Sequence, residues 1–287
     1  MGSFSILNNI AGINAQNQLN LNNVNLNRTL LRLSSGKRIN SGADDAAGLQ
    51  IADSLRANIR AIDQAVRNAN DGIAVAQIAD GALQEISNLL TRAFTLAEEA
   101  ATETVDASGR TALHAEYTQI QAEIARIAVQ TNFNGVALFT AAGLNGDLSV
   151  FVGDITNAST IAVLVPTITA DADAGTVTAL GTADLTTVDL STQPGAVDAF
   201  AVLKTAVDAV ATARGDLGAG MNRLQAAVSV MQTQSQNSQA AESTIRDANM
   251  AQEISNLTKY QILAQSGIAA LAQSNQNAQL VLALLRQ

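Results

Sequence analysis

The fold of this chain is decided by its C-terminal stretch, ISNLTKYQILAQSGIAALAQSNQNAQLVLALLR, residues 254 to 286. Counting alternately three and four residues from Ile254 gives a mostly apolar row at coiled-coil spacing. A second apolar row, with Ile262, Leu280 and Leu284, runs along another side of the same helix. One partner helix cannot cover both rows, so the sequence predicts that this helix packs against several partners. The first row supplies the C-terminal part of a predicted assembly seam, which contains Ile254, Leu257, Ile268, Leu271, Leu282 and Leu285.

The N-terminal region is predicted to form a counterpart helix within residues 4 to 33. Its apolar positions keep a similar rhythm, and residues 14 to 27 between them are dense in Asn and Gln. Either this is a weakly amphipathic, half-disordered arm, or its amide face meets other protein. We favour the second interpretation, because uncharged amides are far easier to bury than ions. This helix supplies the N-terminal part of the assembly seam, Leu19, Leu26, Leu30 and Leu33.

Composition and charge exclude several classes of protein. The net charge of −9 and the small number of lysines argue against a nucleic-acid partner, since phosphate neutralisation requires clustered Lys and Arg. No apolar run is long enough to cross a membrane, and the N-terminus lacks the pattern of a cleaved secretion signal, so we expect neither. Cys is absent, which excludes disulfides and thiolate chemistry. The low aromatic content of 3% suits long helices that pack through small side chains.

The interior of the chain reads as three more helices and one β region. A heptad pattern predicts a helix over about residues 44 to 99, which Ser41 or Asp44 would cap, and a shorter antiparallel helix follows a polar turn at 102 to 109. The pattern returns from Ala196 to Met231, after which the polar stretch 232 to 249 joins the last helix. Between these helices, Thr- and Val-rich runs at 149 to 152 and 160 to 165 predict β-hairpins.

The predicted fold class is therefore mainly α, a long antiparallel helical bundle with paired terminal coiled-coil helices and a small β-hairpin region. We expect an inner coiled-coil domain with its N-terminal half at 1–43 and its C-terminal half at 241–287. The middle domain takes its N-terminal helices from 44–139 and its C-terminal helix from 195–240. Residues 140–194 form the β-hairpin region, with no large outer domain.

No catalytic, cofactor-binding or metal-binding residue is predicted. His114 is the only histidine, so neither a histidine metal site nor a Ser-His-Asp triad can be assembled. Asp171, Asp173 and Gly175 only faintly resemble a calcium loop, and a β-turn explains them better. The tripeptide from Arg214 to Asp216 has an integrin-binding sequence but lies inside the third core heptad, which argues against adhesion.

Five segments resemble bacterial flagellin, in the order of that family. They are SSGKRINSGADDAAG at 34 to 48, NANDGI at 68 to 73, QTNFNGVALF at 130 to 139, ARGDLGAGMNRL at 213 to 224 and QILAQSGIAALAQSNQNAQLVLALLR at 261 to 286. The resemblance implies a structural subunit that polymerises with itself into the helical, tubular filament of the bacterial flagellum. It also implies export from the cell without a cleaved signal peptide. The opening MGSFSILNNI and the final Gln287 depart from the usual family ends.

The resemblance also implies partners. These are the flagellar export apparatus, a flagellin chaperone, the filament cap and the hook-filament junction proteins. A contact with the innate-immune receptor Toll-like receptor 5 is implied at Arg92, Leu96 and Glu116, although Phe94 and Thr95 depart from the charged residues usual there. Two alternatives stay open: a hook-filament junction protein, which shares the terminal architecture, and a secreted enzyme, for which no catalytic constellation is found.

Overall fold

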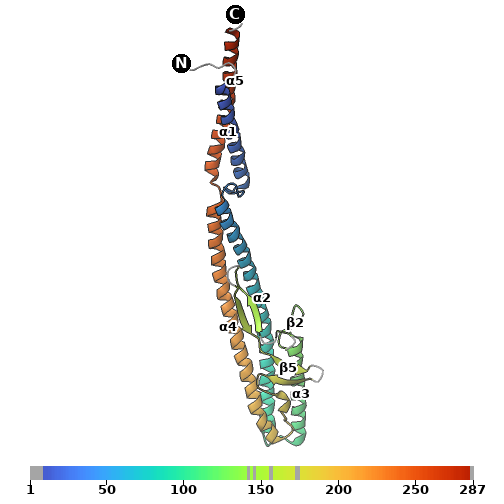
Figure 1. Ribbon diagram of the computed structural model, residues 1–287. Helices are drawn as coiled ribbons and strands as arrows, with labels where there is room; N and C mark the ends of the chain where they lie inside the picture. The colour runs from blue at the N-terminus through green and yellow to red at the C-terminus, as the bar shows by residue number, and fades with distance from the viewer. Residues whose placement is uncertain (1–8, 141–142, 145–146, 155–157, 172–174, 285–287) are drawn as a thin grey trace. The chain divides into compact units, whose positions relative to one another are not determined.

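The computed structural model describes residues 9–140, 143–144, 147–154, 158–171 and 175–284, with side chains in the last helix up to Asn277. Its helices are α1 (Ile10–Ser35), α2 (Ala46–Ala101), α3 (Ala107–Gln130), α4 (Gln193–Arg246) and α5 (Met250–Leu284), as labelled in Figure 1. The short strands are β1 (Asn132–Phe133), β2 (Val136–Ala137), β3 (Asp147–Phe151), β4 (Thr160–Leu164), β5 (Ile168–Asp171) and β6 (Thr176–Leu180), and a 3-10 helix, η1, spans Leu185–Thr187. The predicted class, mainly α with small hairpins, is confirmed.

The chain divides into two compact units, and α2 and α4 contribute residues to both. The first unit contains residues 1–57 and 237–287, and the second contains residues 58–236.

In the first unit, α1 and α5 pack against each other in antiparallel directions. Asn9 caps α1 by accepting a hydrogen bond from the Gly12 N–H at 2.9 Å, and Gly36 ends the helix in the left-handed conformation with φ 71°. The segments after α1 and after α4 are joined by backbone hydrogen bonds, from Arg38 N to Arg246 O and from Ala248 N to Gly36 O. The C-terminal end of α1 and the N-terminal end of α5, which we call the inner ends of these helices, are therefore held together.

The start of α2 differs from the sequence-based expectation. The capping residue is Asp45, whose Oδ1 accepts from the Gly48 N–H at 2.9 Å. Asp44 instead accepts from the backbone N–H groups of Asn40 and Ser41, so it stabilises the preceding turn. Asp45 therefore caps the helix and Asp44 stabilises the turn. The sequence pattern alone does not show which of two adjacent carboxylates has which role.

The core of the second unit is built from α2, α3 and α4. Large and small buried side chains alternate along α4, which lets the neighbouring helix backbones approach closely. The Phe94 and Phe200 rings meet edge to face, with centroids 5.0 Å apart. The large buried positions of α4 are Leu203, Val210, Leu217, Leu224 and Met231, and the small ones include Ala199, Ala206 and Gly220.

Two hairpins pack onto these helices, as expected for the β region. Strands β3 and β4 pair antiparallel, and so do β5 and β6. The β3–β4 hairpin lies against Gly72 of α2 and Gly220 of α4, while β5 and β6 contact α3. A third, two-residue hairpin turns at Asn134 and Gly135, both with positive φ, as an Asn-Gly turn requires.

Helix α4 is longer than predicted. The polar stretch from Gln232, expected to be a connection, is helical as far as Arg246. It contains no Gly or Pro to stop the helix, and the Ser235 hydroxyl donates to Asp63 Oδ1 at 3.0 Å. The connection to α5 is therefore only residues 247–249.

Candidate assembly interface

The side chains that face each other between α1 and α5 are mostly small or polar. Along α1 the buried positions are Gly12, Asn22 and Thr29, and among the described side chains of α5 the buried position is Glu253. Leucines contribute only as half-buried side chains. A pairing of this kind removes little apolar surface from water, and so it gains little hydrophobic stabilisation. The half-buried positions of α5 that complete the row are Leu257, Tyr260, Ala264, Gly267, Leu271 and Ser274.

Apart from these leucines, the large apolar side chains described on the same helices are exposed. We call ten of them the outer apolar face. Ile10 is 64% exposed and Ile268 is 59% exposed, the reverse of an ordinary amphipathic helix pair. On α5, Ile262 and Ile268 lie roughly 120° apart around the helix axis, so more than one side is apolar. The outer apolar face consists of Ile10, Ile13, Leu21, Val24 and Leu31 of α1 with Met250, Ile254, Ile262, Leu263 and Ile268 of α5.

The structure divides the predicted assembly seam between these two surfaces. Five of its residues are half-buried between α1 and α5, namely Leu19, Leu26, Leu33, Leu257 and Leu271. Ile254 and Ile268 belong to the outer apolar face, and Leu30 is exposed on another side of α1. Leu282 belongs to α5, but its side chain lies outside the described part of the chain, as does Leu285 altogether.

Sequence reasoning missed most of the outer apolar face on α1. The predicted seam contains none of Ile10, Ile13, Leu21, Val24 and Leu31. The available signal was their spacing, which places all five on one side of an α-helix. In α5 the side chains turned toward α1 include those of Glu253, Tyr260, Gly267 and Ser274. The three-four count from Ile254 predicts instead the residue that follows each of them, namely Ile254, Gln261, Ile268 and Asn275.

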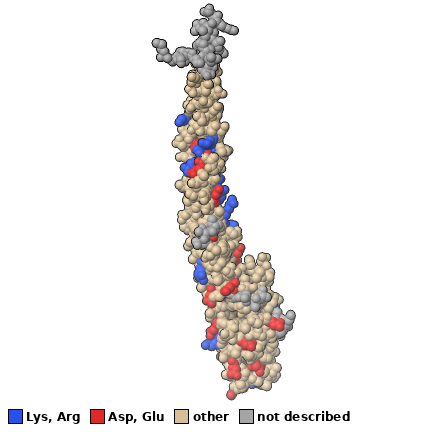
Figure 2. Space-filling view, viewed as in Figure 1, with Lys and Arg blue, Asp and Glu red and all other residues tan. Residues whose placement is uncertain are grey.

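Charged residues of the first unit gather near the inner ends of α1 and α5. Residues 10–27 and 260–284 contain none, and in Figure 2 the corresponding surface is tan where atoms are described. Arg32 lies 3.8 Å from Asp44 and 3.6 Å from Glu253, and Arg28 lies 3.7 Å from Asp44. A second cluster, with separations from 3.5 to 3.8 Å, joins Arg56 to Glu242 and Arg246 to Asp53 and Glu242.

In the first of these clusters, the surroundings of Asp44 stabilise its ionised form. Burial alone would raise the pKa of its carboxyl group. Hydrogen bonds from Asn40 and Ser41, together with the Arg32 guanidinium, outweigh that effect and hold the pKa below its ordinary value. The ionised form of Asp44 is thus favoured by the fold.

The three residues predicted as a receptor contact do not form one exposed surface. Arg92 donates to Glu116 Oε1 from Nε at 2.9 Å and from Nη2 at 2.7 Å, and both side chains are exposed. Leu96 is 0% exposed and belongs to the core of the second unit. Only the ion pair is therefore accessible.

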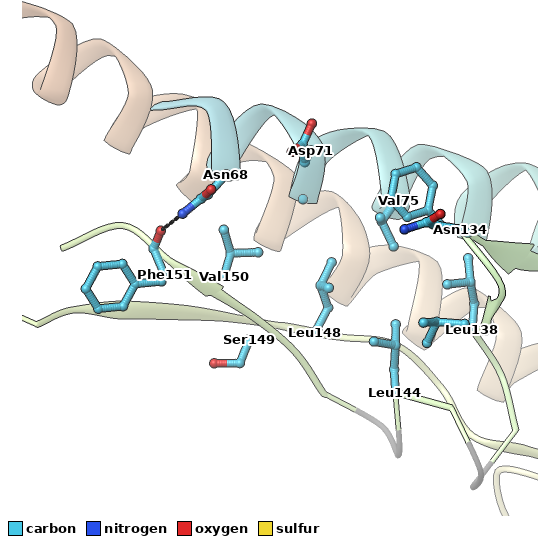
Figure 3. Close-up of a pocket in the computed structure, with 13 residues that line it drawn as sticks. Asn68, Asp71, Val75, Asn134, Leu138, Leu144, Leu148, Ser149, Val150 and Phe151 are labelled. Carbon is cyan, nitrogen blue, oxygen red and sulfur yellow. Dashed lines mark hydrogen bonds between the residues drawn. The ribbon is translucent and has the colours of Figure 1, made fainter. Parts of the chain in front are cut away.

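A groove of about 400 Å³ lies between α2, the β1–β2 hairpin and β3 (Figure 3). Its wall is mainly apolar, and Asn68 Nδ2 donates to Phe151 O at 3.3 Å along one side. Among the described residues that line it, Asp71 is the only titratable one and Ser149 supplies the only side-chain hydroxyl group.

The lone histidine has a structural contact. His114 Nδ1 accepts a hydrogen bond from the Leu190 N–H at 3.3 Å. No group of side chains able to hold a metal ion occurs in the described part of the chain. Within the same residues, no helix has the length and apolar character of a membrane span.

Two family models match the chain. Residues 6–143 match the bacterial flagellin N-terminal helical region, and residues 200–285 match the bacterial flagellin C-terminal helical region. A flagellin of Treponema pallidum is 37% identical over 290 residues, covering 97% of this chain and 98% of that protein. A flagellin of Halalkalibacterium halodurans is 38% identical over 279 residues with the same coverage. The flagellar filament 33 kDa core protein of Treponema phagedenis is 36% identical over 291 residues, again with 97% and 98% covered. None of these matches favours a hook-filament junction protein or an enzyme.

Proposed function

This chain belongs to the bacterial flagellin family of structural proteins and is a subunit of the flagellar filament; from that premise we propose that its outer apolar face is the surface on which neighbouring subunits polymerise. The observation that carries the proposal is the inverted pattern of α1 and α5. The ten large apolar side chains of the outer apolar face are exposed, while the buried positions between the helices are small or polar and the leucines there are only half-buried. Exposed contiguous apolar surface on a soluble protein marks an interaction site.

The occupant of this surface is further copies of the same pair of helices. Residues 10–27 and 260–284 carry no charge, so identical helices can lie side by side without electrostatic repulsion. The predicted seam residues contribute in two ways. Leu19, Leu26, Leu33, Leu257 and Leu271 would pack within one subunit, and Leu30, Ile254 and Ile268 between subunits. We retain the sequence-based domain limits, with 1–43 and 241–287 as the inner coiled-coil domain.

Deleting residues 254–287 tests this proposal. The truncated protein should form no filaments when it is mixed with filament seeds, and its circular dichroism should keep a cooperative thermal transition from the second unit. The core of that unit, from Ile62 to Met231, takes no residue from the deleted segment. Long filaments from the truncated protein, seen by electron microscopy, would show that the surface lies elsewhere.

We further propose that the subunit is exported through the flagellar export apparatus without a cleaved signal peptide and acts outside the cell. Its uncovered apolar C-terminal helix would be held by a flagellin chaperone before export. The filament cap and the hook-filament junction proteins would be its neighbours at the two filament ends. Binding of the chaperone to the full chain but not to the chain lacking residues 254–287 would support this assignment.

Recognition by Toll-like receptor 5 is proposed through Arg92 and Glu116. Arg92 donates from two N–H groups to one oxygen of Glu116, and an accessible Arg is a frequent binding hot spot. Leu96 would contribute only by supporting α2 from inside the core. A receptor-reporter assay on monomeric protein tests this: Arg92→Ala should lower the signal, and an undiminished signal would remove the pair from the contact.

A further inference from the structure

Three polar contacts occur along the otherwise small and apolar contact between α1 and α5. Near one end, Asn9 Nδ2 donates to Ser274 O at 3.3 Å and the Ser274 hydroxyl donates to Asn9 Oδ1 at 3.0 Å. In the middle, Asn22 Nδ2 donates to Tyr260 O at 3.1 Å. Near the other end, Arg32 Nη1 lies 3.6 Å from Glu253 Oε1.

These contacts contribute little to stability. Asn22 is 8% exposed at a position where a leucine would bury more apolar surface. Arg32 Nε and Glu253 Oε2 are buried and have no hydrogen-bond partner among the described residues. An ion pair that is partly buried and leaves atoms unpaired adds little to stability, but polar groups in a helix pair can specify one register.

We propose that the two end layers, Asn9 with Ser274 and Arg32 with Glu253, add to the backbone hydrogen bonds at the inner ends of the helices in holding the register of α1 against α5, and that they restrict α1 to the α5 of its own chain. The middle layer is less selective, because Asn22 donates to a backbone carbonyl, which every residue offers. The inference takes filament assembly as given and names the residues that make the helix pair specific. An outer apolar face without charge cannot supply such specificity, because apolar contacts are not directional.

A displacement of one heptad shows why the layers are selective. Moving α5 by seven residues keeps the same sides in contact. In one direction it places Tyr260 opposite Arg32 in place of Glu253, and in the other it leaves no residue of α5 opposite Arg32, since α5 begins at Met250. The same movement places Gly267 or Val281 opposite Asn9 in place of Ser274. Either displacement removes a side-chain partner at both ends of the pair. Only the native register keeps a side-chain partner for Asn9 at one end and for Arg32 at the other.

A close contact in the native register allows a direct measurement. A Cβ atom on Gly267 would lie 3.9 Å from Leu19 Cβ, a separation that a disulfide accepts. The natural chain has no cysteine, so an introduced pair has no competitor. Leu19→Cys with Gly267→Cys therefore reports the native register, and Leu26→Cys with Gly267→Cys reports a displacement of one heptad.

The experiment compares both cysteine pairs in seeded filaments of the full chain after mild oxidation. In the natural background only the native pair should crosslink, and the product should run as a monomer on a non-reducing gel. Adding Asn22→Leu, Glu253→Gln and Ser274→Ala should raise the ratio of displaced to native crosslinks at least about tenfold, or produce crosslinked dimers, since each of the two end layers is worth roughly fivefold to tenfold. The matched control, Asn23→Leu with Gln273→Ala at adjacent exposed positions, should change neither ratio.

If the triple variant does not enter filaments, two milder variants test the same register proposal. Ser274→Ala removes one layer, while Asn9→Ser with Ser274→Asn exchanges its two members and keeps a capping residue at position 9. Displaced crosslinks should increase in Ser274→Ala and return to the natural level in the exchange. Native crosslinks alone in Ser274→Ala would overturn the proposal. Filament growth by the natural chain is scored separately, so failure of the register proposal is distinct from failure of the assembly surface.

Discussion

The Cγ2 atom of Val150 lies 2.6 Å from the position that a Cβ atom would occupy on Gly72. The β3–β4 hairpin can therefore rest on α2 only because residue 72 has no side chain. Gly220 has the same role on α4, where a Cβ atom would lie 2.7 Å from Val163 Cγ1. Two of the segments that resemble flagellin, NANDGI and ARGDLGAGMNRL, thus contain a glycine needed for the hairpin contact.

Gly72→Ala should lower the free energy of unfolding of the second unit by about 1–3 kcal/mol, because the added methyl group overpacks a filled contact. The matched control is Gly81→Ala in the same helix. A Cβ atom there meets nothing within 4 Å among the described residues, so this change should raise stability by about 0.5–1 kcal/mol. Urea unfolding of the monomer measures both. Equal effects of the two substitutions would contradict the assigned contact.

Both ends of the chain should be unprotected in the free monomer and protected in the filament. The α1–α5 contact buries mostly small and polar side chains, so the pair gains little stability before neighbours cover the outer apolar face. Hydrogen exchange should find fast-exchanging amides over residues 1 to 40 and 250 to 287 in the monomer, and slow exchange there after assembly. Equal protection in the two states would show that the ends fold without neighbours.

Filament stability should fall in acid partly through Asp44. Its folded-state pKa lies below the ordinary value, so its contribution is present at neutral pH and is lost as pH falls through that lowered pKa. Asp44→Asn should weaken filaments at neutral pH and lose less further stability on acidification. Sedimentation of filaments across the acid range measures this. Parallel pH curves for the two proteins would remove Asp44 from the effect.

Periodicity predicted the interior of the molecule well. The helix expected over about residues 44 to 99 is α2, Ala46–Ala101, because its large and small apolar residues keep one rhythm throughout. The strands expected at 149 to 152 and 160 to 165 lie close to β3 and β4. Residues with strong local preferences and no competing contact follow their pattern.

The errors occur where tertiary contacts decide between similar local choices. The three-four count from Ile254 could not show that α5 turns Glu253 and Ser274 inward, since that depends on partners more than 200 residues earlier, such as Asn9 at a separation of 265. The burial of Leu96 follows likewise from the packing of the second unit. Spacing identifies the sides of a helix, but only the partner decides which side is covered.

The central claim, that the outer apolar face carries polymerisation, is tested most directly by the critical concentration of the Ile268→Ser variant. Ile268 is 59% exposed in the single chain, so the substitution should leave the monomer's unfolding transition unchanged. If neighbouring subunits bury this side chain, the critical concentration should rise about tenfold or more, the equivalent of roughly 1.5–3 kcal/mol per buried isoleucine. The control Gln265→Ser, on an exposed polar position of the same helix, should have little effect. An unchanged critical concentration for Ile268→Ser would contradict the account.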